Sequence, residues 1–144
     1  MMTNWDPVWH AINSAFQWLL AEVARVNAEA RSDIKRQSTD FYVFRAYLAF
    51  RRRPGREEDL VVSVDCMLEK GGLYLTSDIA TGSGHVLADG PSTRISSVDA
   101  SDTPAPGVMV WVNSVVDFIK SHRELVCQQL IPEGPDGNDP VKVD

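Results

Sequence analysis

The stretch DLVVSVDCMLEKGGLYLTSDIA, from Asp59 to Ala80, carries the clearest secondary-structure pattern in the chain. Apolar residues alternate with mostly polar ones, and a period of two places one apolar row on a single face of a strand. Lys70, Gly71 and Gly72 supply a turn, because glycine accepts the positive φ values of tight hairpins. The pattern predicts a β-hairpin whose buried row consists of Leu60, Val62, Val64, Cys66, Leu68, Leu73, Leu75 and Ile79.

Further strands are expected on both sides of this hairpin. FYVFRAYLAFR, residues 41–51, is rich in aromatic residues and suits a strand, with RRRPGREED as its connection to the hairpin. Gly-rich and Pro-containing turns then separate a short strand at residues 85–89 from a weaker edge strand at residues 93–98. These segments predict an antiparallel β-meander of four to five strands.

One amphipathic helix is expected before the meander in the sequence and another after it. The first is expected from Pro7 to Arg36, with Asp6 as its N-cap and proline at the first helical position. Its apolar residues recur at helical spacing, which predicts one wide buried face. The second helix is expected from about Val108 to Ile131. We therefore predict an α+β fold in which a long N-terminal and a C-terminal helix cover one face of the meander.

The length of 144 residues suits one domain. We assign residues 1–131 to this α+β domain. Residues 132–144, PEGPDGNDPVKVD after Ile131, form a polar, Pro/Gly-rich segment that we expect to be a flexible tail.

The formal charge of −6 is unevenly distributed along the chain. Residues 1–56 hold nine Lys/Arg and five Asp/Glu, whereas residues 57–144 hold five Lys/Arg and fifteen Asp/Glu. An acidic surface repels phosphate backbones and favours cationic partners, so we expect no nucleic-acid partner. The N-terminus shows no basic region followed by an apolar core, and no apolar run is long enough to span a bilayer. We expect a cytoplasmic protein without a membrane partner, either monomeric or homodimeric.

Cysteines and histidines give no sign of a metal or cofactor site. Cys66 and Cys127 lie outside any CxxC motif, and we expect two free buried thiols, with a disulfide between them as the alternative. His10, His85 and His122 lie far apart in sequence, and His122 projects onto the apolar face of its helix as a structural imidazole. We therefore predict no metal, no cofactor and no catalytic residues.

The outer face of the predicted sheet is the best candidate for a binding site. Asp65 and Asp78 project from it on neighbouring strands; with a two-residue turn they stand diagonally on an exposed surface, which does not suit general acid catalysis. Aromatic and Met residues bordered by charges resemble a protein interface, although a merely solvated face is the alternative. Trp18 projects away from the buried helix face and is a second candidate anchor. The expected partner-binding residues are Tyr47, Asp65, Met67, Tyr74, Asp78 and Trp18.

The helix–meander–helix order from Trp5 to Ile131, together with DLVVSVDCMLEKGGLYLTSDIATGSGHVLADGP at residues 59–91, resembles the bacterial immunity proteins encoded beside polymorphic toxins. The likeness is to TriTu-like immunity proteins of Rhs-type systems. It implies a non-enzymatic protein that binds and neutralises a cognate secreted antibacterial toxin, an ADP-ribosyltransferase being one candidate, through an acidic surface. Two alternatives stay open: a secretion chaperone or adaptor that binds a hydrophobic effector segment, and a small-ligand-binding or hydrolytic domain.

Overall fold

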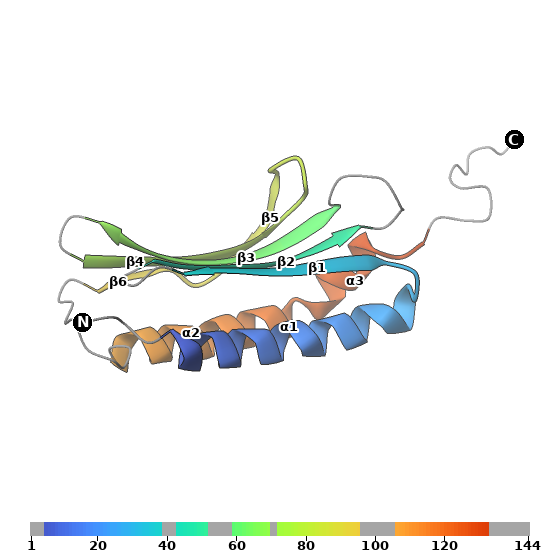
Figure 1. Ribbon diagram of the computed structural model, residues 1–144. Coiled ribbons are helices and arrows are strands. Elements are labelled where there is room, and N and C mark those ends of the chain that lie inside the picture. The colour runs from blue at the N-terminus through green and yellow to red at the C-terminus, as the bar shows by residue number, and fades with distance from the viewer. Residues whose placement is uncertain (1–4, 39–42, 52–58, 70–71, 96–105, 133–144) are drawn as a thin grey trace, which may run out of the picture.

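The computed structural model describes residues 5–38, 43–51, 59–69, 72–95 and 106–132 (Figure 1). Its elements follow the order helix α1, strands β1 to β6, then helices α2 and α3. The predicted α+β fold is confirmed. The expected tail at residues 132–144 lies outside the described residues except for Pro132.

Helix α1 is shorter than the sequence pattern predicts. It spans Asp6–Val26, and the segment expected to continue it forms strand β1, Arg31–Ser38. Asn27 ends the helix with an extended backbone, and its Oδ1 accepts a hydrogen bond from the Glu29 amide at 3.1 Å. An asparagine side chain that satisfies nearby backbone groups competes with helix continuation. The sheet consequently has one more strand at its N-terminal edge than the sequence predicts.

The central strands confirm the predicted hairpin. Strand β3, Leu60–Glu69, pairs with β4, Gly72–Ala80, and Glu69 lies opposite Gly72. The two turn residues between them lie outside the described residues, as do the side chain of Leu68 and residues 52–58 of the arginine-rich connection. Strand β2, Val43–Arg51, pairs with both β1 and β3, so strands β1 to β4 form an antiparallel meander.

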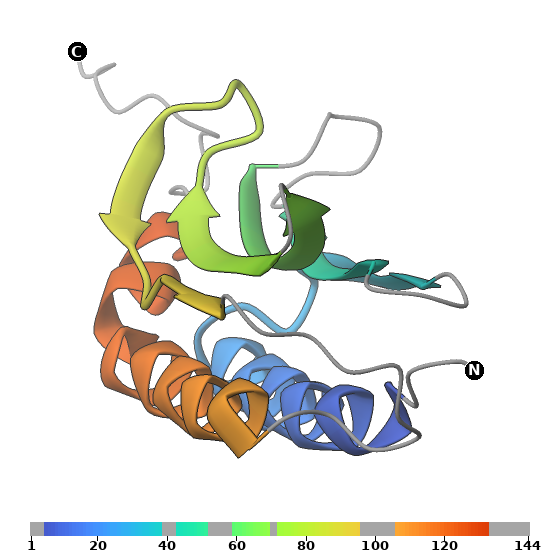
Figure 2. The same ribbon diagram turned by 90° about the vertical axis from the view of Figure 1, so that its left-hand side faces the viewer.

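The last two strands share one neighbour. Strand β5, Val86–Asp89, and strand β6, Thr93–Ile95, both pair with β4, at different ends of that strand. The pairing of β4 with β5 contains a bulge next to Ile79, and this end of the sheet curls away from the helices (Figure 2).

The predicted C-terminal helix is divided into two. Helix α2 spans Pro106–Ser121 and helix α3 spans Arg123–Gln129, with His122 between them. The Phe118 carbonyl accepts hydrogen bonds from the His122 amide, at 3.1 Å, and from the Ser121 hydroxyl, at 3.1 Å. Side chains that bond to a carbonyl one turn earlier bend helices, which accounts for the change of direction at His122.

All helices lie on one face of the sheet, as predicted (Figures 1 and 2). The apolar rows of β2, β3 and β4 face the apolar stripes of α1 and α2 and form one core. Within the described ranges, none of the helices is apolar over a length that would cross a bilayer. The largest fully buried side chains of this core are Phe16, Phe44, Phe50, Ile12, Leu19, Leu48, Leu60, Leu75, Ile79, Ile119, Leu130 and Val8.

Asn27 also joins the C-terminal ends of α1 and α3, and this contact gives a test of the fold. Its buried side-chain amide donates a hydrogen bond to the Leu130 carbonyl at 3.1 Å. We expect Asn27→Ala to lower the free energy of unfolding by about 1–3 kcal/mol, because the buried Leu130 carbonyl loses its donor and the Glu29 amide loses its acceptor. Urea unfolding measures the change. Asn113→Ala, at an exposed position of α2, is the control; an equal effect of both substitutions would contradict the structural role of Asn27.

Candidate functional site

The outer face of the sheet, opposite the helices, carries five of the six residues predicted to bind a partner. Tyr47 comes from β2, Asp65 and Met67 from β3, and Tyr74 and Asp78 from β4. The observed register places Ser63 opposite Asp78 and Asp65 opposite Thr76, so the two acids stand diagonally, as the two-residue turn predicts. Alternation along paired strands is therefore enough to gather these side chains on one surface.

Trp18, the sixth residue, belongs to a different surface. It lies on α1 in the helical layer, half-buried against the core, with Lys120 Nζ 5.8 Å from its ring centroid. The helical projection places Trp18 away from the buried face, but α2 packs along this side of α1 and partly covers the ring. Because the helices lie on the inner face of the sheet, Trp18 and the outer-face residues cannot form one continuous site.

An apolar contact marks one end of the outer face. Met67 lies directly opposite Tyr74, and both side chains keep more than a third of their surface exposed, at 37% and 36%. Arg94 on β6 lies opposite Tyr74, with its guanidinium carbon 4.9 Å from the ring centroid. Large, partly exposed apolar groups beside a cation are typical of interface anchors.

Acidic residues occupy the β3–β5 part of the same face. Asp78 lies directly opposite Asp89, and Asp65 lies diagonally across from Asp78. Partial burial raises the pKa of Asp78, and the like charges of Asp65 and Asp89 raise it further. In the described part of the chain, neither Asp78 nor Asp89 has an ion-pair partner. Among the described residues, this pair of carboxylates is therefore a like-charge contact without a compensating cation.

Basic residues occupy the other half of the face, along β1 and β2. Arg45 Nε donates a hydrogen bond to Asp65 at 2.8 Å, which joins the basic half to the acidic half. Lys35 on β1 lies opposite Tyr47 on β2. Within the described strands, the acidic side chains of the outer face therefore cluster over β3–β5, and Asp33 on β1 is the acid of the basic half. Arg45 could be assigned to the outer face from the sequence, because it alternates in phase with Tyr47. That Asp89 lies opposite another acid could not be predicted, because the bulge in the β4–β5 pairing shifts the register.

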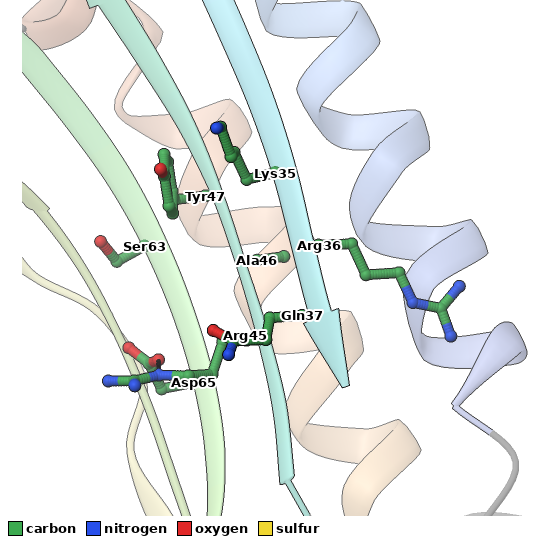
Figure 3. Close-up of a pocket in the computed structure, with 8 residues that line it drawn as sticks. All are labelled: Lys35, Arg36, Gln37, Arg45, Ala46, Tyr47, Ser63 and Asp65. Carbon is green, nitrogen blue, oxygen red and sulfur yellow. Dashed lines mark hydrogen bonds and ion pairs between the residues drawn. The ribbon is translucent and has the colours of Figure 1, made fainter. Parts of the chain in front are cut away.

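A groove of about 490 Å³ opens on the basic half (Figure 3). Lys35 and Tyr47 stand side by side along it, and the Arg45 side chain extends to Asp65 at its lower end (Figure 3). Arg36 points the opposite way, toward α1 (Figure 3), where it donates a hydrogen bond to Asp6 at 3.1 Å. The groove is lined by Lys35, Arg36, Gln37, Arg45, Ala46, Tyr47, Ser63 and Asp65.

The histidines do not come together. His10 lies on an exposed face of α1, and His85 is exposed just before β5. His122 Nδ1 lies 2.8 Å from the Phe118 carbonyl oxygen, which accepts the hydrogen bond, and its ring is tilted by 51° against that of Phe118, with the ring centroids 4.5 Å apart. The hydrogen bond agrees with the structural imidazole predicted for His122, but the ring is half-buried. Among the described residues, no group of three potential ligands is placed to hold a metal ion.

Both cysteines are free and buried, as predicted, and the disulfide alternative is wrong. Burial raises the pKa of the Cys66 thiol to about 12, with a further contribution from the adjacent Asp65 carboxylate. Burial also raises the pKa of Cys127. A thiol with a raised pKa is a poor nucleophile at neutral pH, so both residues serve as small apolar core groups.

Comparison with protein-family models, with curated proteins and with solved structures finds no match for this chain.

The repulsion around Asp78 gives a pH-dependent prediction. A raised folded-state pKa means that the ionised carboxylate destabilises the folded protein at neutral pH, and that this penalty disappears as the pH falls through the raised pKa. We expect Asp78→Asn to raise the free energy of unfolding at pH 7, by up to about 1 kcal/mol because solvent screens a partly exposed group. At about pH 3 the substitution should leave the free energy of unfolding unchanged.

Urea titrations at the two pH values test this expectation. Asp117→Asn, at an exposed position of α2, is the matched control. A loss of stability at pH 7 on Asp78→Asn would show that the ionised carboxylate is favourable in the fold, contrary to the arrangement of charges around it.

Proposed function

We propose that the chain is a non-enzymatic protein-binding module of the immunity type, which neutralises a secreted antibacterial toxin by docking through the outer face of its sheet. The observation that supports this proposal is that Met67, Tyr74, Asp65, Asp78 and Asp89 share one face of the sheet, which none of the described helices covers. Partly exposed apolar anchors bordered by charge are typical of hot spots in protein interfaces.

The charges of the face specify the partner's chemistry. Asp78 and Asp89 repel one another, and a lysine or arginine supplied by the partner would compensate both carboxylates. An apolar group of the partner would cover Met67 and Tyr74, and Tyr74 lies four residues from Asp78 along β4, roughly 13 Å away. We therefore expect a toxin surface that presents a basic side chain and an apolar one at about this separation, and charge complementarity of this kind speeds association as well as fixing orientation.

The alternative functions have less support from the geometry. A chaperone for a hydrophobic effector segment needs an apolar groove, whereas the groove beside β1 is lined mainly by polar and charged side chains, and Met67 and Tyr74 lie outside its lining. A hydrolytic site built on His85 or His122 would need these residues near other reactive groups, but His85 lies in an exposed turn and His122 is engaged at the helix junction.

Binding measurements with candidate toxin domains encoded beside this chain test the proposal. We expect Met67→Ala and Tyr74→Ala each to raise the dissociation constant about tenfold or more, because each removes a central apolar contact. Asp78→Lys should weaken binding further by reversing the charge that the partner meets. Val110→Ala removes a more exposed apolar side chain, 66% accessible, from α2 on the helical side and should leave affinity unchanged.

Protection of bacterial cells from the toxin is the functional readout. The outer-face variants should lose protection in proportion to their loss of affinity, while Val110→Ala retains it. If none of the candidate toxins binds or loses activity, or if the outer-face variants bind and protect like the unmodified protein, the proposal is wrong.

A further inference from the structure

Within the described sheet, strand β1 leaves one long edge unpaired. It is the terminal strand in the order β1-β2-β3-β4-β5 and pairs only with β2 among the described strands. Its eight residues are exposed except for the half-buried Asp33 and Ile34. No described element lies beside this edge (Figures 1 and 2). The opposite edge is formed by strands of only four and three residues, and short edge strands offer little backbone for pairing.

A free strand edge can pair with another strand, and the charges along β1 are complementary to those of a second, antiparallel copy of β1. We propose that a second copy of this chain pairs antiparallel with β1, so that two sheets join into one around a twofold axis at Ile34. This inference goes beyond the proposed function and does not depend on it.

Symmetry limits the possible registers. A twofold axis that joins two antiparallel edge strands side by side must stand perpendicular to the sheet, so outer-face residues meet outer-face residues and helix-facing residues meet helix-facing ones. With Ile34 opposite Ile34 of the second copy, Asp33 lies opposite Lys35 of that copy, and the reverse pair repeats across the axis. The remaining opposed pairs in this register are Arg31 with Gln37 and Ser32 with Arg36.

Charge distinguishes this register from its neighbours. Shifting the centre by one residue toward the N-terminus places Asp33 opposite Asp33, and shifting it by one toward the C-terminus places Lys35 opposite Lys35. Like charges directly opposed across strands are destabilising, whereas opposite charges are favourable. If the charges of β1 served only to prevent edge pairing, like charges would also lie opposite one another in the register centred on Ile34. In that register, however, each Asp33 lies opposite a Lys35 of the second copy.

The contacts within one chain are compatible with this pairing. Asp33 and Lys35 form a loose ion pair, 3.8 Å between Oδ2 and Nζ, and both side chains remain about half exposed, so each can also meet its counterpart in the second copy. Arg36 points inward to Asp6 and Trp9 and does not block the edge. Ile34 packs partly against the core and gains apolar contact when it meets its own copy on the helix-facing side.

Sedimentation analysis of the full chain over a range of concentrations tests the inference. We expect a reversible dimer of the 16.0 kDa chain. Asp33→Lys and Lys35→Asp should each weaken the dimer at least about tenfold, since each turns two attractive pairs into repulsive ones. The double variant D33K/K35D should restore the dimer, and an equimolar mixture of the two single variants should form a heterodimer. Asp117→Lys, on exposed α2, should not weaken the dimer.

A disulfide measurement reports the register directly. Ile34→Cys places two thiols opposite one another, within the separation that a disulfide allows, and should cross-link under mild oxidation. Ser32→Cys separates the two thiols by four residues along the strands, roughly 13 Å, and should not cross-link. A chain that stays monomeric at high concentration, a dimer indifferent to the charge reversals, or equal cross-linking of the two cysteine variants would overturn the proposal.

Discussion

Burial of the apolar rows of β2, β3 and β4 beneath α1 and α2 is the interaction on which the other features depend. Successive side chains of a strand point to opposite faces of the sheet. Once the helices bury the apolar row on one face, the residues between those of the buried row must therefore lie on the other face. The inner rows carry side chains such as Phe44, Val62 and Leu75, all fully buried. The same register places Tyr47, Asp65 and Tyr74 on the opposite side, which no described helix covers.

The fold was predictable from the sequence wherever one periodic pattern dominated. The alternation from Leu60 to Ile79 predicts the central hairpin and its register correctly. The end of α1 was not predictable from periodicity, because Ala30 and Ile34 continue the helical spacing although they lie in or next to β1. Asn27 decides this boundary through side-chain contacts with Glu29 and with Leu130, a residue far away in sequence. Tertiary contacts of this kind override a local pattern.

The candidate site was predictable in its β2–β4 part for the same reason. Tyr47, Asp65, Met67, Tyr74 and Asp78 share a face because their strands pair without a shift. The groove beside Lys35 could not be foreseen, because β1 was expected to be helical, and the opposition of Asp78 to Asp89 depends on a bulged pairing. The surroundings of Trp18 could not be predicted, because a helical projection of one element does not show where a second helix packs.

The central claim is that the outer face of the sheet, rather than the helical layer, meets the partner. Hydroxyl-radical footprinting of the chain alone and in complex with its partner tests this most directly, because methionine, tyrosine and tryptophan side chains all report their own solvent exposure. The account predicts that Met67 and Tyr74 become protected in the complex while Trp18 keeps its reactivity. Protection of Trp18 with unchanged oxidation of Met67 and Tyr74 would place the interface on the helices and contradict the account.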